Sequence, residues 1–151
     1  MKKLIIIVLI VCFVPVSALA SNAETMMWRF NFNAKTYGGK KIDESMITED
    51  TENRVVFSSD GLKISFSSTG DKFNSALVVS ADEAEFLPYC VCAAMCLSPS
   101  FDDNVLESFG YMLYCYLSVR SGKENEFGLF GDYRFYINKV NDNYLFVIGE
   151  K

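Results

Sequence analysis

The side chains with the greatest capacity for chemistry in this sequence are four cysteines, Cys90, Cys92, Cys96 and Cys115. Four thiolates can bind a zinc ion when they converge on one point. The first three lie on one predicted helix, where Cys90 and Cys92 point about 200° apart because successive residues turn by roughly 100°. The spacing also lacks the Cys-x-x-Cys pattern of redox enzymes. We therefore assign neither a metal site nor a cofactor site to these cysteines.

Two interpretations of the cysteines remain open, a disulfide bond and a set of buried free thiols. If the two predicted helices fold back on each other around residues 99–101, Cys115 lies across from residues 85–90. Cys90 and Cys115 then form the most feasible disulfide, with Cys92 as an alternative partner. The competing interpretation is that all four thiols are small buried apolar groups, as free cysteine commonly is.

The chain contains no histidine. This excludes Ser-His-Asp and Cys-His catalysis and histidine-based metal sites. The glycine-containing segments match neither a phosphate loop nor a dinucleotide fingerprint, and the acidic clusters at 49–52 and 82–85 lack the ligand spacing of a calcium loop. We assign no catalytic, cofactor-binding or metal-binding residue. Hydrolysis by carboxylates or by a Ser-Lys pair stays as the alternative chemistry.

Aromatic residues gather in the last third of the chain, between Tyr111 and Phe146. Some of them must face solvent if the predicted strands there alternate between two faces. Tyr136 and Tyr144 lie off the sets that we expect to face inward. They form the candidate contact surface, which suits a protein or a glycan partner because tyrosine combines an apolar ring with a polar tip.

The first twenty residues have the features of a secretion signal. Two lysines precede an uninterrupted apolar run, Leu4 to Val14, and small residues at 18–20 suit signal peptidase. The run is about half the ~20 residues that span a bilayer, so we expect cleavage and no stable membrane insertion afterwards. The sequence therefore predicts a signal peptide at 1–20 and one domain at 21–151, secreted or located in the periplasm or cell envelope.

The composition limits the partners of this domain. The full chain carries a net charge of −5, and loss of Lys2 and Lys3 with the signal makes it −7. An acidic protein without a basic stripe repels phosphate backbones, so nucleic acid is excluded as a partner. Aromatic residues make up 15% of the chain, which favours a packed core over disorder.

The segment before the helices predicts a meander of strands. Apolar and polar residues alternate from Trp28 to Lys35, which is typical of a strand with one buried face. Asp60-Gly61 lies between two β-rich runs and predicts a tight hairpin. A further strand is expected over 73–80, and the polar run 43–53 is expected to be a loop.

The second half predicts two helices followed by a hairpin. Ser80 and Glu83 have the spacing of a capping box ahead of an apolar helix that ends near Ser98. A second helix follows and ends at Gly122, and strands at 133–137 and 144–148 close the chain. The fold class is therefore α+β: an antiparallel sheet with an N-terminal strand meander, a central two-helix hairpin packed on one face, and a C-terminal β-hairpin.

These observations favour an exported, non-enzymatic binding or interaction domain. Export, small size and the absence of catalytic motifs support this interpretation. The alternative from another class is a small histidine-independent hydrolase that uses carboxylates or a Ser-Lys pair.

Overall fold

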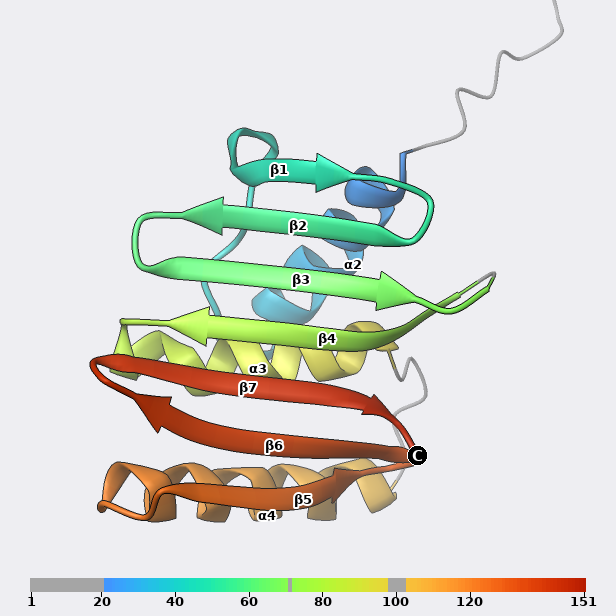
Figure 1. The fold of residues 1–151 in the computed structure, drawn as a ribbon. Coiled ribbons are helices and arrows are strands. Elements are labelled where there is room, and N and C mark those ends of the chain that lie inside the picture. The colour runs from blue at the N-terminus through green and yellow to red at the C-terminus, as the bar shows by residue number, and fades with distance from the viewer. Residues whose placement is uncertain (1–20, 71, 98–102) are drawn as a thin grey trace, which may run out of the picture.

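The computed structural model describes residues 21–70, 72–97 and 103–151. Within these residues the protein is an α+β domain, in which a seven-stranded antiparallel sheet carries three helices on one face (Figure 1). The predicted fold class is confirmed. The predicted signal peptide, residues 1–20, lies outside the described residues, and every described helix and strand follows it in the chain.

The expected strand over 28–35 is wrong, because this segment belongs to helix α2 (Asn22–Tyr37). Ser21 and Glu24 form a capping box at its start, and Gly38 ends it with a left-handed φ of 81°. The buried positions include Met26, Phe30 and Ala34, which follow the helical period. The alternation of aromatic residues was therefore coincidental, and the capping box was the informative signal.

The predicted meander is confirmed as four antiparallel neighbours, β1 (Ile47–Asp50), β2 (Arg54–Ser59), β3 (Leu62–Ser68) and β4 (Phe73–Ser80). The Asp60-Gly61 turn joins β2 to β3, with Gly61 at a φ of 71° that favours glycine. Strand β1 lies in the run that we expected to be a loop. It was missed because Ile47 is its only apolar residue. A short 3-10 turn, Glu44–Met46, precedes it.

Helices α3 (Glu83–Leu97) and α4 (Asp103–Arg120) follow β4. The α3 N-cap is Asp82, whose carboxylate accepts from the amides of Ala84 and Glu85, rather than the predicted Ser80. Both helices lie on the same face of the sheet, but α3 lies behind β4 and β7 whereas α4 lies behind β5 and β6 (Figure 1). The connection predicted around Pro99 lies outside the described residues.

The C-terminal strands are β5 (Asn125–Phe130), β6 (Tyr133–Val140) and β7 (Asn143–Glu150). The predicted hairpin is β6–β7, and β5 adds a strand that the sequence did not indicate. The sheet order is β1-β2-β3-β4-β7-β6-β5, so β7 returns to pair with β4 and β5 becomes an edge strand.

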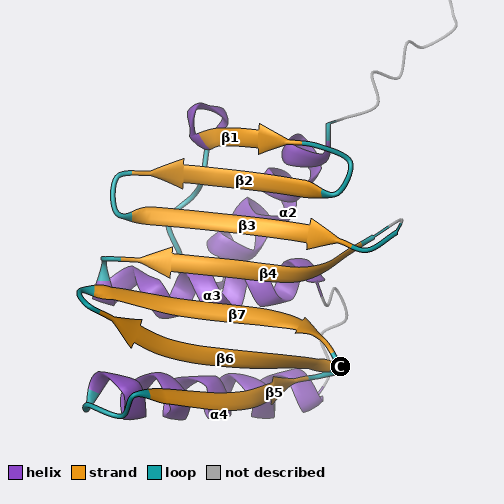
Figure 2. Ribbon diagram, in the orientation of Figure 1, coloured by secondary structure: helices purple, strands orange, loops and turns teal. Residues whose placement is uncertain are grey.

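The core lies between the sheet and the helices. Alternate residues of the central strands point toward the helices and are fully buried, as Ile64, Val78 and Phe146 are. Helix α3 is buried on nearly every side, because both the sheet and α2 pack against it. The opposite face of the sheet carries no described helix (Figure 2). We call this uncovered face the open face.

Candidate functional site

All four described cysteines are buried free thiols. The candidate Cys90–Cys115 disulfide is not formed, because α4 lies under the edge of the sheet rather than against α3. On α4 it is Tyr116 that faces α3, donating a hydrogen bond of 2.8 Å to the carbonyl of Glu83. Cys115, one residue earlier, points to β5, where its thiol contacts the carbonyl of Phe127 at 3.8 Å. Neighbouring residues of a helix point in different directions, so Cys115 points away from Cys90 on α3 while Tyr116 faces α3.

The four thiols lie in surroundings that disfavour reaction. Burial raises the pKa of Cys92 and of Cys96 to about 12, and it raises the pKa of Cys90 and Cys115 as well. A reactive cysteine needs the opposite shift, because the thiolate is the nucleophile and the metal ligand. Among the residues that the structure describes, no three His, Cys, Asp or Glu side chains gather in a way that could hold a metal ion.

The expectation that Tyr144 is exposed is wrong. Only 2% of this side chain is exposed, and its hydroxyl donates to Glu83 Oε2 at 2.9 Å. Tyr144 alternates in phase with Phe146 and Ile148, which all face the helices. Its ring packs against Phe86 of α3, with centroids 5.2 Å apart. Tyr144 is therefore part of the core.

Tyr136 does lie on the open face, within a row of apolar side chains that crosses four strands. Phe127 of β5 pairs with Tyr136, Tyr136 pairs with Val147 of β7, and Val147 pairs with Leu77 of β4. The rings of Phe127 and Tyr136 lie 4.9 Å apart. We call these four residues the apolar row. Phe127 is 65% exposed and Val147 40% exposed, so no described segment covers the row.

The open face changes character beyond the row. Leu77 pairs with Ser65 on β3, and serines also follow on the same face of β2 to β4. Arg134 of β6 is a charged residue beside the row on the same face, and it pairs with Leu129 of β5. The apolar row therefore crosses β5, β6, β7 and β4, whereas β3 and β2 carry mainly serine, lysine and arginine on this face, with Val56 as the apolar exception.

The two edges of the sheet differ. Strand β1 has four residues, two of them acidic, and an irregular register with β2, features that protect an edge from pairing. Strand β5 has six residues in regular register with β6, and its outward side chains on the open face include Phe127 and Leu129. This strand was not predicted, because Gly128 interrupts its aromatic residues.

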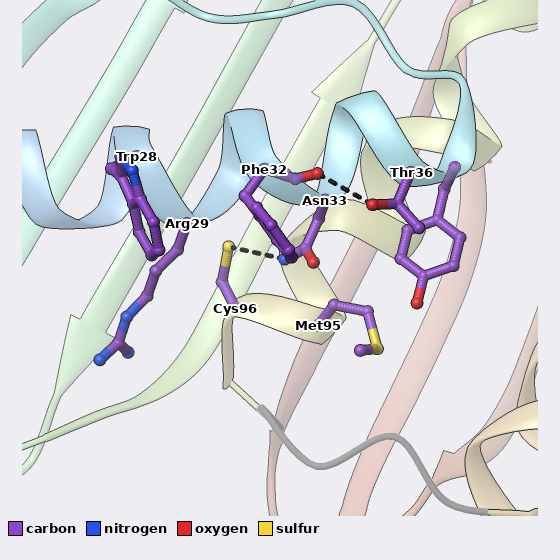
Figure 3. Close-up of a pocket in the computed structure, with 8 residues that line it drawn as sticks. Trp28, Arg29, Phe32, Asn33, Thr36, Met95 and Cys96 are labelled. Atoms are coloured by element: carbon purple, nitrogen blue, oxygen red, sulfur yellow. Dashed lines mark hydrogen bonds between the residues drawn. The ribbon is translucent and has the colours of Figure 1, made fainter.

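A second apolar feature lies behind the sheet (Figure 3). It is a pocket of about 320 Å³ lined by Trp28, Arg29, Phe32, Asn33, Thr36, Tyr37, Met95 and Cys96. Trp28 and Phe32 stack at a centroid distance of 5.8 Å, and the Asn33 amide contacts the Cys96 thiol at 3.8 Å. Residues 98–102 follow this end of α3 and lie outside the described residues. The surroundings of this pocket are therefore only partly described, and we place the candidate site on the open face.

One polar cluster bears on the hydrolase alternative. Lys40 lies 3.5 Å from Asp82 and 3.4 Å from Glu85, and the Glu85 carboxylate is the main cause that raises the pKa of Lys40. A Ser-Lys pair requires a lysine with a lowered pKa so that it can act as a base. Ser80 is also engaged, since its hydroxyl accepts from the Asp82 amide at 3.1 Å. This cluster gives the hydrolase alternative no support.

Comparison with protein-family models, curated proteins and solved structures finds no match to this chain. Of the helices that the structure describes, none has both the length and the apolar character needed to cross a membrane.

Proposed function

We propose that this protein is an exported, non-enzymatic interaction domain that binds a protein partner through the apolar row of its open face. The observation that carries the proposal is the uncovered apolar row, in which Phe127 and Val147 are exposed and Tyr136 and Leu77 are half-buried. Contiguous apolar side chains on an uncovered surface often mark a site of protein–protein contact.

The chemistry of the row favours a protein over a glycan. Its four side chains lie on one sheet face and offer a single hydroxyl, that of Tyr136. A glycan requires several convergent hydrogen-bonding groups, whereas aromatic and aliphatic side chains with few charges are typical of the centre of a protein interface. The serines on the other half of the face would then form part of the polar rim.

Export rests on the signal-like residues 1–20. Cleavage after Ala20 would leave the described domain whole, because its first helix begins at Asn22. We expect the protein from envelope and culture fractions to begin at Ser21, which N-terminal mass spectrometry measures. A cytoplasmic protein that retains Met1 would contradict export.

The contact surface is tested by affinity capture from the same fractions with the purified protein as bait. We expect V147K to lose a specific protein partner that the wild type retains, because the lysine places a charge in the row. V140K is the matched control, since Val140 lies on the open face outside the row and is 49% exposed. Equal recovery with V147K and wild type would contradict the assigned surface, and turnover of a substrate would favour the hydrolase.

A further inference from the structure

The pocket between α2 and the C-terminal end of α3 combines an aromatic wall with polar groups that have no partner (Figure 3). Its volume of about 320 Å³ is at the lower end of the range for small-molecule sites. The residues that line it lie on these two helices, which cover the face of the sheet opposite to the apolar row. The pocket is therefore separate from the contact surface proposed above.

Two aromatic side chains of α2 form the wall of the pocket. Trp28 and Phe32 lie one helical turn apart, and their rings stack with centroids 5.8 Å apart and planes inclined by 21°. They are 68% and 61% exposed, so they lie outside the core to which Met26 and Phe30 of the same helix belong. Met95 of α3 adds an apolar side chain. A flat apolar ligand can pack here with little ordering of the protein, because the two rings already hold each other in place.

Arg29 supplies a positive charge to the pocket. Its guanidinium has no ion-pair partner among the described residues, whereas Arg54 and Arg120 are each paired with a glutamate. Burial raises the pKa of Cys96, and the positive charge of Arg29 offsets part of that increase, so this charge reaches the groups that line the pocket. None of the described lining residues is acidic. The pocket therefore favours an anionic ligand.

Asn33 is the buried polar group of the pocket. Only 8% of this residue is exposed. Its amide nitrogen contacts the Cys96 thiol at 3.8 Å, while its side-chain oxygen has no hydrogen-bond partner among the described residues (Figure 3). A ligand that donates a hydrogen bond would satisfy this oxygen. Arg29 precedes Asn33 by one turn on the same side of α2, so a single small ligand can reach both.

From these features we infer that the pocket binds a small aromatic carboxylate that carries an N–H donor beside the carboxylate. The carboxylate pairs with the planar guanidinium of Arg29, whose geometry matches it. The N–H donates to Oδ1 of Asn33, and the aromatic ring packs against Trp28 and Phe32. The inference goes beyond the proposed function and does not depend on it.

The same features disfavour other classes of ligand. A phosphate or sulfate group needs several convergent donors, whereas the pocket offers one guanidinium among mainly apolar side chains. A quaternary ammonium group, which aromatic rings also bind, is repelled by Arg29. An uncharged aromatic ligand leaves the guanidinium without a partner.

Trp28 makes the test direct, because it is the only tryptophan of the chain. Its fluorescence, excited where phenylalanine derivatives do not absorb, reports on a ligand in the pocket. The probe is N-acetylphenylalanine, which has the ring, the N–H and the carboxylate. We expect a saturable change with a Kd below about 1 mM, the scale for a ligand of about fifteen non-hydrogen atoms. A weaker Kd, or no saturable change, overturns the inference.

Two related compounds separate the contributions of the polar groups. N-acetylphenylalaninamide keeps the ring and the N–H but lacks the carboxylate, so it should bind at least about tenfold more weakly. 3-Phenylpropionate keeps the ring and the carboxylate but lacks the N–H, and it should bind about threefold to tenfold more weakly. Equal affinity of the amide overturns the role of Arg29, and equal affinity of 3-phenylpropionate overturns that of Asn33.

Matched variants locate the site. R29Q should weaken the binding of N-acetylphenylalanine about tenfold or more and remove its preference over the amide. R134Q is the control, because Arg134 is also exposed and without an ion pair among the described residues but lies on the open face. An unchanged R29Q, or an equal loss in both variants, overturns the assigned site. V147K should bind the probe as the wild type does, so this inference and the proposed function fail independently.

A free small molecule and the carboxyl-terminal residue of a peptide can both present this chemistry. A glycine-rich peptide that ends in phenylalanine with a free carboxylate distinguishes the two sources. Binding of this peptide more tightly than N-acetylphenylalanine supports a peptide terminus as the source of the carboxylate. Equal or weaker binding of the peptide supports a free small molecule.

Discussion

Phe127 of β5 lies directly opposite Tyr136 of β6 on the open face, with ring centroids 4.9 Å apart and planes inclined by 48°. The two rings join the edge of the sheet to the apolar row. This strand pair thus places Phe127, at the edge of the sheet, at one end of the apolar row.

We expect this ring pair to be coupled in stability by about 0.5–1 kcal/mol, as aromatic cross-strand pairs are. A double-mutant cycle of F127A and Y136A, measured by urea unfolding, gives the coupling. The control cycle pairs F127A with V56A on the distant strand β2. Equal coupling in the two cycles would contradict a direct contact.

Tyr144 should behave as a buried hydrogen-bonded residue. Removal of its hydroxyl in Y144F leaves Glu83 Oε2 without this donor and should lower the free energy of unfolding by about 1 kcal/mol. Y136F is the matched control on the open face and should be nearly neutral. Chemical denaturation measures both, and similar stabilities for the two variants would contradict a stabilising hydrogen bond from Tyr144 to Glu83.

Gly128 should not tolerate a side chain. An added Cβ would lie 2.6 Å from Phe135 Cε1 and 2.8 Å from Tyr111 Cδ1, so G128A should destabilise the fold by about 1–3 kcal/mol. G149A is the control, because its Cβ would meet Ser75 at an ordinary 3.6 Å. Thermal unfolding compares the two. Equal midpoints would contradict the close packing of Phe135 and Tyr111 against Gly128.

A thiol titration of the protein without residues 1–20 should find four free thiols per chain under denaturing, unreduced conditions. The physical reason is that Cys115 points to β5 while Cys90 lies within α3. In the native protein the thiols should react slowly with alkylating reagents, because burial disfavours the thiolate. A count of two would revive the Cys90–Cys115 disulfide and require α4 to lie closer to α3.

The raised thiol pKa values predict a loss of stability in alkali. The pKa of Cys96 is about 12 in the folded protein against an ordinary value of 9.0. Folding therefore favours the protonated thiol. The contribution of this protonated thiol to the free energy of unfolding is fully present below pH 9. It is lost as the pH rises toward 12, by up to about 1.4 kcal/mol per pH unit. The stability difference between wild type and C96A should shrink over that range in urea titrations, and a constant difference would contradict the shift.

The elements that the sequence predicted correctly have strong local signals. The Asp60-Gly61 turn, the strand over 73–80 and the two central helices are indicated by residue types and periods within each segment. The strand predicted over residues 28–35 was wrong, because the residues there fit both the period of a strand and the period of a helix. The capping box at Ser21 decides for a helix, and the burial of Phe30 against α3 completes it.

The candidate site was only partly predictable. Tyr136 was identified, but Tyr144 was assigned to the wrong face, because alternation alone does not say which of two faces a sheet buries. Phe127 was noted only as part of an aromatic cluster. Its importance depends on β5 being an edge, which is a property of strand order.

The sequence by itself determined the α+β class, the turns and the acidic, histidine-free character of the domain, since these follow from residue types and short-range patterns. Only the tertiary structure decided that β7 returns to β4, that the three described helices cover one face, and that β5 ends the sheet. These features depend on contacts between residues far apart in the chain, which no local pattern records. Because β5 is an edge and the open face has no described helix, Phe127 lies where a partner can reach it.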